Sequence, residues 1–132
     1  MAFYLADDQV QSYHELRDWD APAARTKGFA EVIQDLFCFA MTPVAAGIEG
    51  CPIYQASQVW AGKVQGSGEG IASGQRVYAT LASNFQLVTA NPVGVIGTDF
   101  YFCGWAKREA LANDDQVLIR FWGHEHDHAD RA

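Results

Sequence analysis

The sequence predicts a mainly β protein, a small antiparallel β-barrel or β-sandwich that carries an extended N-terminal arm. From about residue 42 onwards, glycine and serine separate short runs that are rich in Val, Ile, Tyr, Phe and Trp. No helical segment of about 10–15 residues lies between these runs, which excludes parallel βαβ units. The chain has 132 residues, of which 49% are hydrophobic, and this suits one domain with a packed core.

Composition divides the chain into three regions. We expect residues 1–35 to form the arm, extended or partly helical, residues 36–123 to form the β-barrel domain, and residues 124–132 to form a polar, histidine-rich tail. Their net charges are −4, −1 and −2, so most of the total charge of −7 lies at the two ends. Because the sequence has no basic stripe, we expect no direct binding to nucleic acid. Its apolar runs fall far short of the roughly 20 residues that span a bilayer, so we expect no membrane insertion.

The predicted arm combines polar residues with large apolar ones. Ser12 and Glu15 fit a capping box, which favours one or two helical turns around "SYHELRDW". A solvated tail would not need so many large apolar groups, and such groups usually find a surface on the same protein or on a partner. The candidates for such contacts are Phe3, Tyr4, Leu5, Tyr13 and Trp19.

Residues 28–41, "GFAEVIQDLFCFAM", allow two interpretations. The apolar residues from Phe29 to Ala40 recur with helical spacing. The aromatic end of the segment favours a strand, and we predict a strand over Leu36–Met41 after an irregular or helical start.

The β domain is predicted strand by strand from its apolar runs and turn residues. In the last strand Val117, Ile119 and Phe121 share one face, as a half-buried strand requires. Turn-forming segments such as "GSGEG", "ANP" and "ANDD" connect the runs. The predicted strands are Ile53–Ala56, Gln58–Val64, Gln75–Leu81, Phe85–Thr89, Gly94–Ile96, Phe100–Lys107 and Gln116–Trp122.

The sequence contains no motif that indicates catalysis or a cofactor. It has no Gly-x-Ser-x-Gly, and Lys63 precedes the glycine-rich segment 66–70 instead of following it, which excludes a P-loop. The carboxylates of the β domain fall in or beside turns, where solvated side chains are expected. We therefore expect a protein that is not an enzyme and that has no cofactor.

The cysteines and the C-terminal histidines are the candidate metal ligands of the sequence. Cys38, Cys51 and Cys103 are odd in number and far apart, and we expect reduced, buried thiols. His124, His126 and His128 would project to one side of an extended chain, roughly 6.6–7 Å apart. Nothing apolar anchors this segment, so we expect a polar terminus and no metal site. The alternative is a small metal-binding protein that uses these three histidines.

The aromatic residues of the β domain suggest a second alternative. Several of them could form a face on which sugars stack, although aromatic residues of small barrels also fill cores and interfaces. The candidates for this carbohydrate-binding module are Trp60, Tyr78, Phe102, Trp105 and Trp122.

Residues 47–122 resemble the small β-barrel decoration, or cement, proteins of tailed-phage heads. The resemblance lies in short motifs between residues 74 and 120. They are Gly74 with Val77 and Tyr78, Gly104–Trp105–Ala106, the turn Asn113–Asp115, and the closing strand with Val117, Ile119 and Arg120.

The resemblance implies a structural virion protein. Such a protein would be made in the host cytoplasm and bind the exterior of the capsid head as a homotrimer. Its partner would be the major capsid protein, whose neighbouring subunits it would cement together. We add the hypothesis that the N-terminal arm reaches across a boundary between capsid subunits through its apolar residues.

Overall fold

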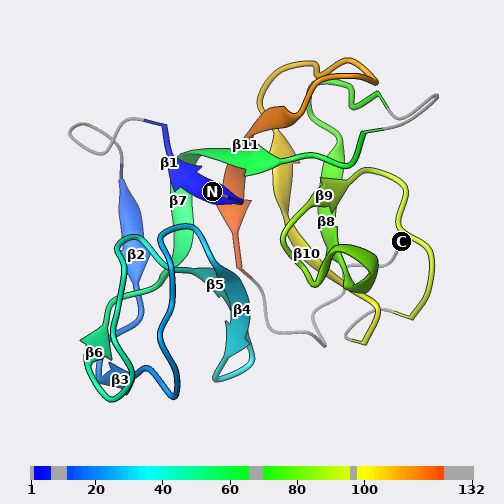
Figure 1. The fold of residues 1–132 in the computed structure, drawn as a ribbon. Coiled ribbons are helices and arrows are strands. Elements are labelled where there is room, and N and C mark those ends of the chain that lie inside the picture. Colours follow the sequence, from blue (N-terminus) through cyan, green and yellow to red (C-terminus); the bar gives the residue numbers. More distant parts are fainter. Residues whose placement is uncertain (1, 7–11, 66–69, 96–97, 124–132) are drawn as a thin grey trace.

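The longest strand, β7 (Ile53–Gly62), organises the sheet. We describe a computed structural model of residues 2–6, 12–65, 70–95 and 98–123. Strand β11 (Gln116–Trp122) pairs antiparallel along one edge of β7. Along the other edge β7 pairs with β2 (Tyr13–Glu15) in its first half and with β1 (Phe3–Leu5) in its second half. Figure 1 shows β7 between these elements.

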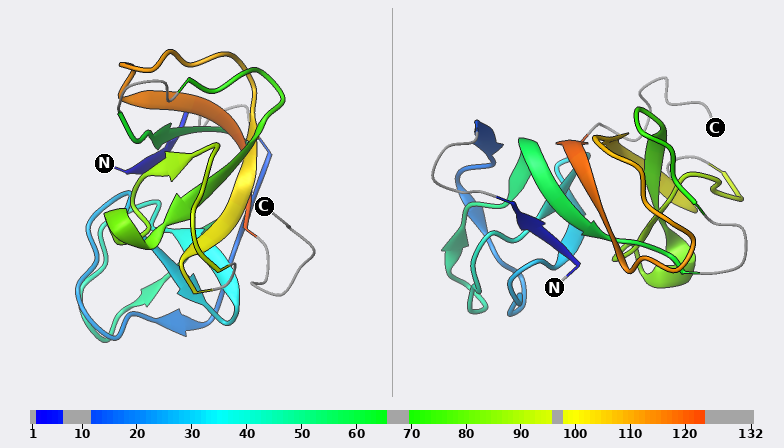
Figure 2. Two further views of the ribbon diagram at one scale, coloured as in Figure 1. Left: turned by 90° about the vertical axis from the view of Figure 1, so that its right-hand side faces the viewer. Right: turned by 90° about the horizontal axis from the view of Figure 1, so that it is seen from above.

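The main sheet has the strand order β4-β5-β7-β11-β10-β8-β9, and β1 and β2 join it at β7. The sheet curls, as Figure 2 shows in two further views. This arrangement confirms the predicted mainly β class with antiparallel pairing. The remaining strands of this sheet are β4 (Ala30–Ile33), β5 (Leu36–Phe39), β8 (Arg76–Thr80), β9 (Val88–Thr89) and β10 (Phe100–Ala106).

Two smaller elements complete the described fold. Strands β3 (Trp19–Asp20) and β6 (Glu49–Gly50) form a separate two-stranded sheet, which lies at the opposite end of the molecule from β8 and β9 (Figure 1). A single 3₁₀ turn, Leu81–Ser83, follows β8.

The core lies on the concave side of the curled sheet and is rich in phenylalanine. Phe3, Phe37, Phe39 and Phe121 come from three strands, and their rings contact one another with centroids 5.0–6.0 Å apart. All four are almost completely buried. Burial of one such side chain stabilises a fold by about 1.5–3 kcal/mol, so this cluster is a major source of stability.

The second half of the sheet closes on itself next to β9. The backbone N–H of Val64 donates to the carbonyl oxygen of Val88 at 2.9 Å, and Lys63 forms a parallel bridge with Val88. Lys63 is buried, and its ammonium group donates to the carbonyl oxygens of Val64 (2.9 Å) and Ala112 (3.1 Å). The buried charge therefore joins two loops at this closure.

The prediction of a separate N-terminal arm over residues 1–35 is wrong for the described part of that range. Strands β1, β2 and β4 are all paired within the main sheet. Phe3 is 0% exposed. Apolar residues of this segment, such as Phe3, pack in the core of their own chain, because this burial removes their apolar surface from water. The boundary at residue 35 therefore falls in the turn between β4 and β5.

The helical interpretations of this region are also wrong. Tyr13–Glu15 is a strand, so Ser12 and Glu15 do not form a capping box. Residues 30–39 form the β4–β5 hairpin, whose turn residues Gln34 and Asp35 have φ values of 52° and 67°. Two successive positive φ values are typical of a type I′ turn. The predicted strand over Leu36–Met41 is confirmed as β5, which ends at Phe39.

Four predicted strands of the β domain differ clearly from the observed ones. Ile53–Ala56 and Gln58–Val64 form one continuous strand, β7, with an irregularity where it pairs with β11. Phe85–Thr89 shortens to Val88–Thr89, because Asn84 and Phe85 adopt positive φ values of 54° and 62° in a turn. In Gly94–Ile96, residues 94 and 95 lie in a loop and Ile96 lies outside the described residues.

Candidate functional site

Three of the exposed large apolar side chains, among them the most exposed one, belong to neighbouring loops at one end of the barrel. Leu81 belongs to the 3₁₀ turn after β8, and Val93 and Val95 belong to the loop between β9 and β10. Their exposed fractions are 52%, 90% and 63%. We call these three residues the apolar end. Exposed apolar groups that gather in one place usually mark a surface where another molecule docks.

Hydrogen bonds to Asp99 hold the loops of the apolar end in place. The Asp99 carboxylate accepts the backbone N–H of Val95 at 2.9 Å. The carbonyl oxygen of Asp99 accepts the backbone N–H of Leu81 at 2.7 Å, and its own N–H donates to the carbonyl oxygen of Val95 at 2.8 Å. Asp99 thus links the backbone of Leu81 to that of Val95.

A shallow hollow lies beside the apolar end. Its volume is about 590 Å³, and apolar side chains form much of its wall. Val64, Leu81, Pro92 and Val93 are the larger apolar residues that line it. The hollow continues the apolar character of this end and would accept a side chain from a partner.

A second feature is an aromatic face on β8, β10 and β11, opposite the core. Tyr78 and Phe102 are buried within it, and Trp105 and Trp122 are half-buried at its border. The guanidinium group of Arg120 lies over the rings of both tryptophans, 5.9 Å and 5.5 Å from their centroids. Stacked arginine and tryptophan side chains form cation–π contacts that fix the position of the guanidinium group.

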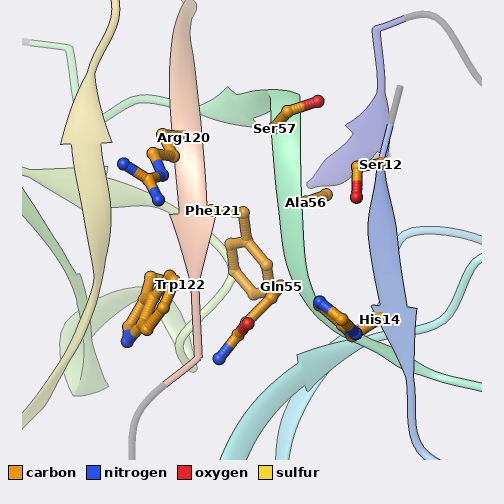
Figure 3. A pocket seen from close by; sticks show the side chains of 8 residues that line it. All are labelled: Ser12, His14, Gln55, Ala56, Ser57, Arg120, Phe121 and Trp122. Carbon is orange, nitrogen blue, oxygen red and sulfur yellow. The ribbon is translucent and has the colours of Figure 1, made fainter. Parts of the chain in front are cut away.

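A polar groove begins at this aromatic face and crosses β7. Its volume is about 160 Å³. Figure 3 shows Arg120 and Trp122 of β11 on one side, Ser12 and His14 on the other, and Gln55 of β7 between them. The register explains this neighbourhood, because Gln55 is paired with His14 of β2 and with Trp122 of β11. We call this feature the Arg120 groove.

The predicted arm residues do not come together on one exposed surface. Phe3 lies in the core, and the hydroxyl of Tyr4 donates to Oε1 of Gln116 at 3.1 Å. Leu5 and Tyr13 are half-buried against the core cluster. Trp19 packs against Gly50 in the small β3–β6 sheet. Their predicted role in capsid binding stays a prediction for the half-buried side chains, whereas Phe3 cannot reach a partner while the core is intact.

The predicted sugar-stacking residues are only partly brought together. Tyr78, Phe102, Trp105 and Trp122 share the aromatic face. Trp60 is separate and lies under Arg108, whose guanidinium carbon is 5.4 Å from the ring centroid. The rings of Tyr78 and Phe102 are buried, whereas those of Trp105 and Trp122 are half-buried.

Sequence reasoning missed the apolar end and the Arg120 groove. The sequence predicts a short strand over Gly94–Ile96 between the turns "ANP" and "GTD", although so short an apolar run between turn residues also fits an exposed loop. His14 and Gln55 carry no signal of their own. They meet Arg120 only because β2 and β11 pair with opposite edges of β7.

The cysteines of the described structure are free thiols. Cys38 and Cys103 are buried as predicted, whereas Cys51 is exposed. Burial raises the pKa of Cys38 to about 12 and raises the pKa of Cys103 as well. Both thiols are therefore protonated at neutral pH, the form that is a poor nucleophile.

No group of three or more histidine, cysteine or acidic side chains in the described ranges could hold a metal ion. His124, His126 and His128 lie outside these ranges, so the alternative of a histidine metal site stays a prediction. In the same ranges, no helix has the length and apolar character needed to cross a membrane.

No protein-family model matches the chain, and neither a curated protein nor a solved structure matches it. Support for a function therefore comes from the apolar end, the Arg120 groove and the motifs in the sequence.

Proposed function

We propose that this protein is a structural virion protein, not an enzyme, that binds the outer surface of a tailed-phage capsid. In this role it cements neighbouring subunits of the major capsid protein. The observation that carries the proposal is the apolar end, where three large apolar side chains, Leu81, Val93 and Val95, are exposed. A monomer that never docked would gain nothing from a valine that is 90% exposed.

The physical basis of cementing is the burial of apolar surface at a joint between capsid subunits. Each docked copy removes the apolar end and the surface beneath it from water, and this burial favours association. A stable protein interface buries about 1,600 Å² in total, so neighbouring polar residues must surround the apolar contact. Asp99 and Asn91, which line the hollow beside it, would supply such a polar rim.

Oligomerisation would strengthen a weak single contact. We propose a homotrimer, in which three apolar ends dock on one capsid at the same time. After the first contact, the second and third become intramolecular and add affinity without any new type of interaction. A modest apolar contact per subunit is then sufficient for stable decoration.

The sequence motifs support the same role. The pieces of residues 47–122 that resemble capsid cement proteins fall mainly on β8, β10 and β11 and on the turn before β11. These strands carry the loops of the apolar end or pair directly with those that do. Under this proposal the protein is made in the host cytoplasm and resides on the exterior of the capsid head.

Docking through the apolar end replaces docking through an extended arm. Deletion of residues 1–20 would remove Phe3 from the core and two strands from β7. Loss of binding in such a deletion would therefore report unfolding, and it could not test the capsid contact.

Co-sedimentation with expanded, undecorated phage capsids tests the proposal. The wild-type protein should pellet with capsids and reach saturation at a fixed number of copies. The double variant Val93→Asp/Val95→Asp should bind at least tenfold more weakly, because it places two charges in the contact. Ile48→Asp is the matched control, because Ile48 is also apolar and 57% exposed but lies next to β6, at the other end of the molecule.

The outcomes separate the function from the surface that performs it. If the wild-type protein does not bind expanded capsids assembled from a major capsid protein of the same genome, the proposed function is wrong. If it binds and the double variant binds equally well, the function stands and the apolar end is not the contact. Light scattering of the purified protein measures whether a homotrimer forms before docking.

A further inference from the structure

The Arg120 groove contains a positively charged group whose position is fixed in advance. The guanidinium group of Arg120 is stacked on Trp105 and Trp122, and the side chain is nevertheless exposed. The two tryptophan rings are inclined at 62°, so they contact the guanidinium group from two directions, and the exposed side chain can still donate N–H bonds to a ligand. A ligand that binds these edges does not have to immobilise a flexible side chain first, which reduces the entropic cost of binding.

The charge of Arg120 lacks a nearby acid within the described part of the chain. The ion pairs found there are Arg17 with Glu15 and Arg25 with Glu31. Among the described residues Arg120 is therefore a positively charged group without an ion-pair partner. The ligand group that matches a guanidinium edge best is a carboxylate, which accepts two parallel hydrogen bonds.

The rest of the groove suits a molecule that has both hydroxyl groups and apolar faces. Gln55 offers a donor and an acceptor on one planar amide, and Ser12 and His14 add polar groups on the opposite side (Figure 3). Trp122 contributes a flat apolar surface at the other side of the groove. Sugars combine hydroxyl edges with apolar ring faces, and an aromatic ring beside a few polar groups is the usual composition of a small-molecule site.

We propose that the Arg120 groove binds an acidic saccharide, a sugar chain that carries carboxylate groups. Arg120 pairs with a carboxylate, Trp122 stacks on a sugar ring, and Gln55 and His14 bond to hydroxyl groups. This site shares no residue with the apolar end. The inference therefore goes beyond the capsid-binding proposal, and either one can fail without the other.

Titration calorimetry of the full chain with tetragalacturonate tests the inference, with neutral maltotetraose as the comparison. The wild-type protein should bind the acidic sugar with millimolar or tighter affinity and at least tenfold more tightly than the neutral one. Arg120→Gln removes the cation, and Gln55→Glu places a carboxylate in the groove with almost no change in shape. Each should weaken binding of the acidic sugar by at least tenfold.

Arg108→Gln is the matched control. Arg108 also stacks on a tryptophan, Trp60, but does not line the groove, so this variant should bind as the wild type does. Thermal unfolding of each variant checks that the fold is retained, which is expected because the side chains of both Arg120 and Arg108 are exposed.

Four results would overturn the inference. They are the absence of binding at millimolar tetragalacturonate, equal affinity for the neutral sugar, wild-type affinity in Arg120→Gln and Gln55→Glu, and equal affinity for a tetraglutamate peptide. The last result would show a general site for carboxylates instead of a sugar site.

Discussion

The side-chain amide of Gln86 pairs with the backbone of Ala30 as a neighbouring strand would. Oε1 of Gln86 accepts the N–H of Ala30 at 2.9 Å, and Nε2 donates to the carbonyl oxygen of Ala30 at 2.7 Å. Ala30 begins β4, and Gln86 precedes β9, the two strands at opposite ends of the sheet order. One amide therefore satisfies part of an open sheet edge and links the two ends of the curled sheet.

Replacement of Gln86 by leucine should destabilise the fold by about 1–3 kcal/mol, because the buried N–H and C=O of Ala30 would lose their partners. Urea unfolding followed by tryptophan fluorescence measures the change. The control is Gln65→Leu, since the amide of Gln65 makes only one exposed hydrogen bond of 3.4 Å to Asn113. It should change stability by less than about 0.5 kcal/mol. Equal effects of the two substitutions would contradict the bridging role of Gln86.

Replacement of Phe3 by alanine should cost about 3–5 kcal/mol in unfolding free energy, the usual range for loss of a buried phenylalanine. The reason is that its ring contacts Phe37, Phe39 and Phe121, with centroids 5.7–5.9 Å away. Denaturant unfolding is the measurement. The adjacent control Tyr4→Phe removes only the hydrogen bond to Gln116 and should cost about 1 kcal/mol. Wild-type stability in Phe3→Ala would restore the idea of a free N-terminal arm.

The three thiols should differ in reactivity. Iodoacetamide at pH 8 should modify Cys51 in the native protein, because Cys51 is exposed whereas Cys38 and Cys103 are buried and protonated. Mass spectrometry should count one adduct before unfolding and three in urea. Rapid native modification of Cys38 or Cys103 would contradict the observed burial.

The raised pKa of Cys38 also predicts a loss of stability in alkali. In the unfolded chain this thiol ionises near its ordinary pKa of 9.0, whereas in the folded protein burial raises the pKa to about 12. Between these values the folded state binds more protons, so the unfolding free energy falls as the pH rises from about 9 to about 12. Cys38→Ala should show a shallower decline over this range, and an unchanged slope would contradict this assignment.

Much of the sheet could be predicted because strands have local signatures. In β11 Val117, Ile119 and Phe121 lie in the main core, as the period of two in the sequence predicts, and Leu118 on the other face is buried as well. The predicted bounds Gln116–Trp122 are those observed. The β4–β5 hairpin could not be recognised in the same way, because Gln34 and Asp35 adopt a turn that usually contains asparagine or glycine.

The candidate surfaces were harder to predict than the strands. Trp105, Trp122 and Arg120 lie in recognised strands, but their stacking depends on the register between β10 and β11, where Trp105 is opposite Arg120. The apolar end likewise depends on tertiary contacts, because Asp99 bonds to the backbone of both Leu81 and Val95. Neither feature follows from residue type or spacing alone.

The sequence by itself determined the mainly β class, the positions of most strands in the second half of the chain, and the face of each strand that is apolar. These properties follow from local alternation and turn chemistry. Only the tertiary structure decided where the N-terminal segment lies, how the sheet curls, and which side chains meet in the Arg120 groove. These depend on pairing between residues far apart in sequence, such as Phe3 with Ala61 and Ala30 with Gln86. Such partners are selected by the total burial and hydrogen bonding of the folded chain, which no local segment contains.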